Sequence, residues 1–97
     1  MARRIYLNDG SGKSFNIDAA VRFGSNYFFD GRNMICAATS SQWEHEALYR
    51  TKRGRWVLHW QSNWQGVPDR WWVISEEVAM RWLKKNNPEA WEKLQAK

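Results

Sequence analysis

Apolar and polar residues alternate in short runs as far as residue 74, a pattern typical of half-buried β-strands. Ile5 and Leu7 share one face of the first run, and Phe15 and Ile17 share one face of the second. Residues 19–25 fit neither a strand nor a helix clearly. The runs that are candidates for strands cover residues 4–7, 13–17, 27–29, 33–37, 47–51, 55–60 and 70–74.

Turn signals separate these runs and indicate hairpins. Residues 8–12, Asn-Asp-Gly-Ser-Gly, form a strong turn signal between the first two runs. Asp30-Gly31 favours a type I′ turn between the next two. Residues 52–54 predict a three-residue loop in which Gly54 takes a positive φ.

Alternation assigns the side chains of the strand after this loop to two faces. One face carries Trp56, Leu58 and Trp60, and the other carries Val57 and His59. A polar loop follows, before the last predicted strand.

The last quarter of the chain changes to a helical period. Ser75 is a good N-cap, and Glu76 and Glu77 place negative charge in the first turn, where the helix dipole favours it. The apolar stripe at helical spacing comprises Val78, Ala79, Trp82 and Leu83.

Two further helical segments are predicted. Asn87 and Pro88 end the first helix and begin a short second one, with Asn87 as its cap and Pro88 in its first position. Ser41, followed by Glu44, fits a capping box and favours a turn or a single helical turn over residues 41–46. A β-strand interpretation of Leu48-Tyr49 competes with a helix in this region.

These elements predict an α+β fold, an antiparallel meander of five or six short strands with the C-terminal helix packed on one face. The chain has 97 residues, and we expect residues 1–97 to form a single domain. The predicted core consists of Ile5, Leu7, Phe15, Ile17, Leu48, Leu58, Ile74, Val78, Trp82 and Leu83.

A specific set of residues lies between Leu48 and Leu83. It comprises Leu48-Tyr49-Arg50-Thr51, Gly54, Trp56, Leu58-His59-Trp60, Ser62, Trp64-Gln65-Gly66, Ile74-Ser75-Glu76-Glu77 and Trp82-Leu83. In these residues the chain resembles a group of small bacterial proteins of uncharacterised function. The resemblance covers about a third of the chain. It implies a strand–turn–strand–loop–strand–helix unit in a bacterial or mobile-element setting, and no activity.

Composition narrows the class of binding partner and the cellular compartment that we expect. A core of this size cannot easily enclose eight tryptophans, because each buried indole N–H needs a hydrogen-bond partner, so some should be exposed. The net charge of +5 is compatible with a nucleic-acid or an acidic protein partner. A single cysteine, Cys36, excludes an internal disulfide and favours a reducing compartment. No apolar run reaches membrane-spanning length, so we expect a cytoplasmic protein without a membrane partner.

Catalytic and metal chemistry have weak support in the sequence. Glu44-His45-Glu46 brings carboxylates and an imidazole together, but strand geometry directs His45 to the face opposite the two glutamates. No base stands at a spacing that would activate Cys36. One cysteine and two histidines lack the paired spacing of a zinc site. We therefore expect no enzymatic activity, no catalytic residue, no metal and no cofactor.

A tryptophan-rich region is the first candidate binding surface. It comprises Trp60, Trp64, Gln65 and Trp71. Indoles in a polar, glycine-containing loop suit protein recognition, because tryptophan gives a large contact area at a low entropic cost. The alternative is that Trp64 folds back and covers one end of the core.

A basic hairpin tip is the second candidate surface. It comprises Arg50, Lys52, Arg53 and Arg55. Cations beside aromatic residues can engage phosphates and stacked bases, although a solvated turn has the same composition. The other basic residues are spread along the chain, which weakens the nucleic-acid interpretation.

These features favour a non-enzymatic protein-binding module, such as a small inhibitor or regulatory accessory protein of a phage or mobile element. Nucleic-acid binding by the basic hairpin tip is the alternative function. The identity of the partner and the oligomeric state stay open at this point.

Overall fold

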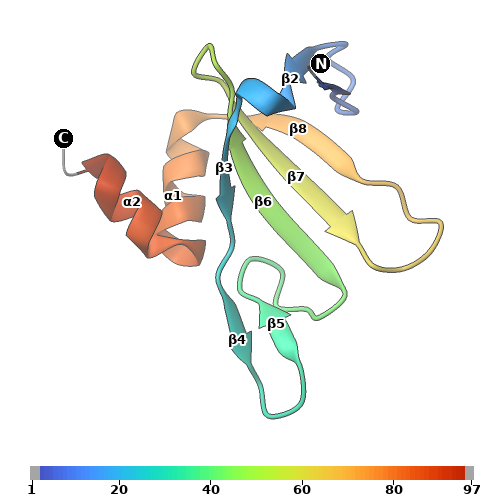
Figure 1. Cartoon of the computed structure of the whole chain (residues 1–97), viewed down its shortest axis with the longest axis vertical. Helices are drawn as coiled ribbons and strands as arrows, with labels where there is room; N and C mark the ends of the chain where they lie inside the picture. Colours follow the sequence, from blue (N-terminus) through green and yellow to red (C-terminus); the bar gives the residue numbers. More distant parts are fainter. Residues whose placement is uncertain (1–2, 96–97) are drawn as a thin grey trace.

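A computed structural model describes residues 3–95 and confirms the predicted α+β architecture, with antiparallel strands followed by C-terminal helices (Figure 1). No helix in this range is long and apolar enough to cross a membrane. The elements in chain order are β1 (Arg4–Tyr6), β2 (Ser14–Asn16), the 3₁₀ helix η1 (Ile17–Ala19), β3 (Val21–Gly24), β4 (Tyr27–Phe29), β5 (Met34–Cys36), β6 (Glu44–Arg50), β7 (Trp56–Ser62), β8 (Arg70–Ile74), α1 (Glu76–Asn86) and α2 (Pro88–Gln95).

The strands form three antiparallel sheets rather than one meander. The main sheet has the order β3-β6-β7-β8, while β1 pairs only with β2 and β4 pairs only with β5. The β4–β5 hairpin lies between β3 and β6 in the sequence, although these two strands are neighbours in the sheet. In Figure 1 the hairpin extends below the main sheet. There are thus eight strands in the described chain, against the five or six predicted.

The β6–β7 hairpin forms the centre of the main sheet. Its register runs from Arg50 opposite Trp56 to Glu44 opposite Ser62. At its turn, the Thr51 N–H donates to the Arg55 carbonyl at 2.8 Å, and Gly54 has a φ of 87°. This confirms the predicted three-residue loop, because only glycine adopts this φ without steric cost.

One face of the main sheet packs against the helices. Leu48, Trp56 and Leu58 of the sheet meet buried residues of α1, with Trp91 and Leu94 of α2 at the margin. The buried apolar residues of α1 are Ala79, Trp82 and Leu83.

The opposite face of the main sheet packs against the β1–β2 hairpin. Leu7 and Phe15 cover Ala47, Tyr49 and Val57 there. The prediction of one core was therefore wrong in its arrangement, because the central strands bury side chains on both faces. Of the predicted core residues, the N-terminal ones belong to this second cluster, and those from the later strands and α1, apart from Val78, belong to the first.

Val78 was wrongly placed in the core. It is 40% exposed, since it lies at the edge of the helical stripe on which Ala79, Trp82 and Leu83 are centred. Trp82 buries its indole and still satisfies the N–H, which donates to Glu46 Oε1 at 3.0 Å.

Two local turn predictions also need correction. Residues 41–46 form no helical turn, because strand pairing of β6 begins at Glu44, and the Ser41 hydroxyl instead accepts from the N–H groups of Trp43 and Glu44 within a bend. The β4–β5 loop has four residues, not two. Asp30 Oδ1 accepts from the N–H groups of Arg32 and Asn33, which widens the turn.

Replacing single side chains of α1 with Ala should distinguish its buried positions from its exposed ones. Leu83→Ala should lower the free energy of unfolding by about 2–5 kcal/mol, because Leu83 is fully buried between α1 and the sheet. Val78→Ala, the matched control in the same helix, should change it by about 0.5 kcal/mol or less. Urea unfolding measures both, and equal losses would contradict this packing.

Candidate functional site

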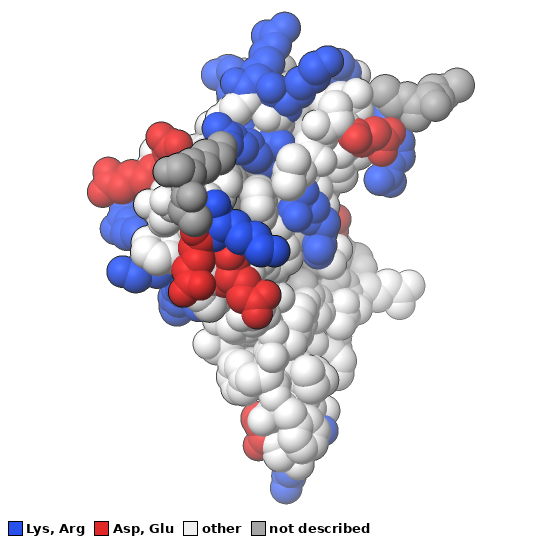
Figure 2. Space-filling view, turned by 60° about the vertical axis from the view of Figure 1, so that its left-hand side comes forward, with Lys and Arg blue, Asp and Glu red and all other residues white. Residues whose placement is uncertain are grey.

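The two ends of the molecule differ in chemical character (Figure 2). Lys and Arg side chains gather at the upper end, while the lower end is largely without charge apart from its tip. We call them the basic end, which holds the β6–β7 turn and the β1–β2 hairpin, and the apolar end, which holds the β4–β5 hairpin and the ends of β6 and β7 farthest from their turn, next to Trp43 and Trp64.

A surface cavity of about 380 Å³ lies at the basic end, between the β1–β2 hairpin and the β6–β7 turn. Four cationic residues line it, namely Arg4, Lys52, Arg53 and Arg55. Three of them belong to the predicted basic hairpin tip. The fourth, Arg4, comes from β1 and was not among the residues predicted for the tip.

Arg50, the fourth residue of the predicted tip, lies elsewhere. Its guanidinium lies 5.3 Å from the centre of the Trp56 ring, on the face of the sheet that carries the helices. Strand alternation explains the separation, because Arg50 and Leu48 share one face while Thr51 and Arg55 turn toward the β1–β2 hairpin.

The β4–β5 hairpin displays large apolar side chains at the other end. Phe28, Phe29 and Met34 are 50%, 64% and 55% exposed, and Tyr27 is also exposed. Phe29 and Met34 are cross-strand neighbours, whereas Phe28 points to the opposite face of the hairpin. Sequence reasoning missed this surface, although three consecutive aromatic residues without a polar face were a visible signal.

The base of this hairpin is attached to the main sheet. The Tyr27 hydroxyl lies 2.8 Å from His45 Nδ1. Cys36 is fully buried, and its N–H donates to the Ser41 carbonyl at 2.9 Å. The base is therefore held while the aromatic outer part projects.

Trp64 lies at the apolar end, as an exposed residue of the β7–β8 loop beside the exposed Gln65. Its ring packs against that of Trp43 with 5.1 Å between centroids. The pair lies where β6 begins and β7 ends, because the Asn63 N–H donates to the Trp43 carbonyl. Trp64 therefore does not fold back over the core.

Trp60 and Trp71, the other two residues of the predicted tryptophan surface, lie on opposite faces of the main sheet. Trp71 is directly opposite His59, whereas Trp60 is opposite Arg70, whose guanidinium lies 5.9 Å from the Trp60 ring centre. Both are half-buried. The structure thus does not bring Trp60, Trp64 and Trp71 into one surface.

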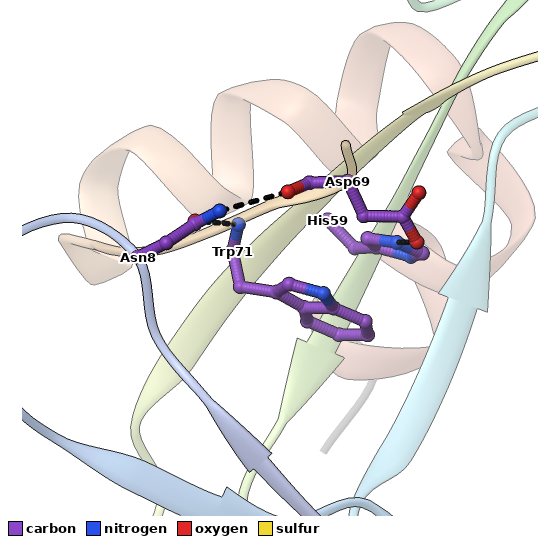
Figure 3. Close-up of polar contacts among 4 residues, drawn as sticks. All are labelled: Asn8, His59, Asp69 and Trp71. Atoms are coloured by element: carbon purple, nitrogen blue, oxygen red, sulfur yellow. Dashed lines mark hydrogen bonds and ion pairs between the residues drawn. The ribbon is translucent and has the colours of Figure 1, made fainter. Parts of the chain in front are cut away.

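Trp71 belongs to a polar cluster that joins three segments (Figure 3). Its ring stacks on the His59 ring, with 3.7 Å between the ring centroids and 9° between the planes. His59 Nε2 lies 2.8 Å from Asp69 Oδ2. Asn8 accepts from the Trp71 N–H at 2.7 Å and donates to the Asp69 carbonyl at 2.8 Å. The cluster therefore holds the β1–β2 turn against the start of β8.

Burial controls the charge state of His59. It lowers the pKa of the imidazole by disfavouring the cation, and this outweighs the hydrogen bond and the charge of Asp69, which raise the pKa. The imidazole is therefore predominantly neutral at neutral pH, which suits its stacking on Trp71.

The chemical groups that the sequence singled out have different surroundings. Glu46 is hydrogen-bonded to Trp82, whereas His45 contacts Tyr27, the cross-strand neighbour of Cys36. Cys36 is buried: burial raises its thiol pKa, and hydrogen bonds from Ser25 and backbone N–H groups together lower it further than burial raises it. Within residues 3–95 no three His, Cys, Asp or Glu side chains are grouped so as to hold a metal ion.

Searches of protein-family models, of curated proteins and of solved structures find no match to this chain.

Stability should fall on mild acidification because of His59. An unfolded chain has a His59 pKa near the ordinary value of about 6.5, and the folded chain has a lower one. Protons therefore bind the unfolded state first, so the stabilisation is complete above about pH 6.5 and is lost as the pH falls through the folded pKa. Urea midpoints at pH 7.5, 6.5 and 5.5 measure it.

His59→Gln should flatten this pH dependence, and His45→Gln controls for the loss of a histidine elsewhere. An unchanged slope in the His59 variant would show that another group is responsible.

Acrylamide quenching should distinguish exposed from buried tryptophan. Trp64→Phe should remove much of the readily quenched fluorescence, because Trp64 is 59% exposed. Trp82→Phe should leave the quenched fraction nearly unchanged, because this ring lies between α1 and the sheet. Equal effects of the two substitutions would contradict an exposed Trp64.

Proposed function

We propose that this protein is a non-enzymatic protein-binding module that holds another protein at its apolar end. The observation that carries the proposal is the β4–β5 hairpin, which exposes Phe28, Phe29 and Met34 while its base is attached to the main sheet. The binding surface consists of this hairpin together with Trp64 and Gln65, and leaves out Trp60 and Trp71.

Physical chemistry supports a bound state for this hairpin. A two-stranded ribbon is marginal by itself in water, and apolar side chains exposed on both of its faces add a solvation cost. A partner that covers Phe28 and Phe29 removes this apolar area from water. Aromatic residues on a positioned scaffold are also the residues that most often dominate binding energy at interfaces.

The charge distribution favours a protein over a phosphate-bearing ligand at this end. The lower part of the molecule in Figure 2 is largely white, with Asp30 and Arg32 in the hairpin loop. The buried centres of protein interfaces are similarly depleted of charge, whereas phosphate recognition requires clustered cations. A small inhibitor or regulatory accessory protein of a phage or mobile element would use such a surface.

Site-specific photo-cross-linking in cells of the source organism tests this surface. A photoreactive residue in place of Phe29 should give a discrete adduct with another protein, and one in place of Trp64 should give the same adduct, because both belong to the apolar end. One in place of Val78, exposed on α1, should give none. Mass spectrometry of the adduct identifies the partner.

Introducing a charge at the apolar end provides the matched control. Met34→Glu should abolish the adduct formed from position 64, while Met34→Leu should preserve it, because only the first charges the surface. An adduct at twice the mass of the chain would indicate self-association and overturn the proposal. Equal yields from positions 29 and 78 would do the same.

A further inference from the structure

We infer that the cavity at the basic end binds the phosphate backbone of a single-stranded nucleic acid, with Tyr6 stacking on a base. This inference does not rest on the proposed protein-binding function, because it concerns the opposite end of the molecule.

The first argument is the uncompensated charge of the cavity. The described residues that line the cavity include four cations, namely Arg4, Lys52, Arg53 and Arg55. They include no carboxylate. Asp18, which follows β2, is engaged by Arg3, accepting from its N–H at 2.8 Å and lying 3.6 Å from its Nε. Four cations in one concave surface attract a polyanion more strongly than the same charges spread over the molecule.

The second argument is the set of hydrogen-bonding groups around these cations. Ser14, Asn16 and Thr51 line the same cavity. Arg4 Nη1 donates to Ser14 Oγ at 3.1 Å, which orients the guanidinium and leaves donors for a ligand. Arginine forks and hydroxyl groups are the side chains that contact phosphate oxygens in nucleic-acid complexes.

The third argument is the position of Tyr6. It is 71% exposed and stands two residues from Arg4 on β1, so both side chains lie on the same face of the β1–β2 hairpin, although Tyr6 itself does not line the cavity. The two positions are roughly 7 Å apart along the strand, which lets one nucleotide touch both. An exposed ring beside phosphate-binding cations is the arrangement by which proteins bind unpaired bases, whereas bases in a duplex are already stacked.

The folding of the chain creates this site from dispersed residues. Arg4 is separated from the β6–β7 turn by more than forty residues, and the packing of Phe15 against Tyr49 brings the two hairpins together. The scattered basic residues that weakened the nucleic-acid interpretation of the sequence are thus partly gathered at one end.

Fluorescence anisotropy with a labelled mixed-sequence single strand tests the inference. Binding at low salt should weaken as salt rises, with a log–log slope near −2.8 if four phosphates are neutralised. Replacing Arg4 and Arg53 with Ala should reduce the size of this slope by about 1.4. Replacing Lys52 and Arg53 with Ala removes two cavity charges as well, and it should reduce the slope by the same amount. Thermal unfolding confirms that the variants are folded.

The matched control removes equal charge from the helices. Lys85→Ala with Lys93→Ala changes two exposed lysines outside the cavity and should leave the slope near the wild-type value. If this pair reduces the slope as much as the cavity pairs do, binding follows net charge alone and the site is overturned.

Tyr6→Ala separates stacking from charge. It should weaken binding of the single strand by about fivefold or more without changing the slope, and it should leave binding of inorganic polyphosphate unchanged. Equal effects on both ligands, or none on either, would overturn the role of Tyr6. Tighter binding of a duplex than of the single strand would overturn the assignment of ligand, and no binding at low salt would overturn the inference. Phe29→Ala should not affect any of these results.

Discussion

The antiparallel pairing of β6 with β7 is the constraint on which the rest of the structure depends. These two seven-residue strands are buried on both faces, with Leu48 and Leu58 facing the helices and Tyr49 and Val57 facing the β1–β2 hairpin. Because successive side chains on a strand point to opposite faces, one pairing register specifies both cores at once. A slip of one residue would exchange the two sets of side chains, and neither α1 nor the β1–β2 hairpin would then have a matching surface.

The same pairing separates the two ends of the molecule. The β6–β7 turn projects at one end, where its cations meet Arg4 of β1. The strands finish at the other end beside Trp43 and Trp64, and there the inserted β4–β5 hairpin extends beyond the main sheet. The basic cavity and the aromatic surface are therefore two consequences of one scaffold. They offer different chemistries at opposite ends, so ligands of the two proposed sites would not compete with each other.

Much of the fold could be predicted from local signals. Ser75, Asn87 and Pro88 begin the helices where capping chemistry predicts, and Gly54 takes the positive φ expected of it. Less of the candidate site could be predicted. Lys52, Arg53 and Arg55 lie together as expected for a hairpin tip, but Arg50 lies on the other face, and Trp60 and Trp71 are separated by the sheet. Each of these differences follows from strand alternation combined with a register that only the folded chain reveals.

The sequence by itself determined the elements whose causes are local: the caps of the helices, the β6–β7 turn, and the alternation that gives each central strand two apolar faces. These depend on backbone preferences and on neighbours within a few residues. The tertiary structure decided which element covers each face and which distant side chains meet. The β1–β2 hairpin, and not a helix, covers Tyr49 and Val57, and Arg4 joins the β6–β7 turn only as a result. It also decided that Phe28 and Phe29 stay uncovered, because no other described element packs over the outer part of their hairpin. Such outcomes depend on contacts between residues far apart in the chain, for which a sequence pattern carries no distance information.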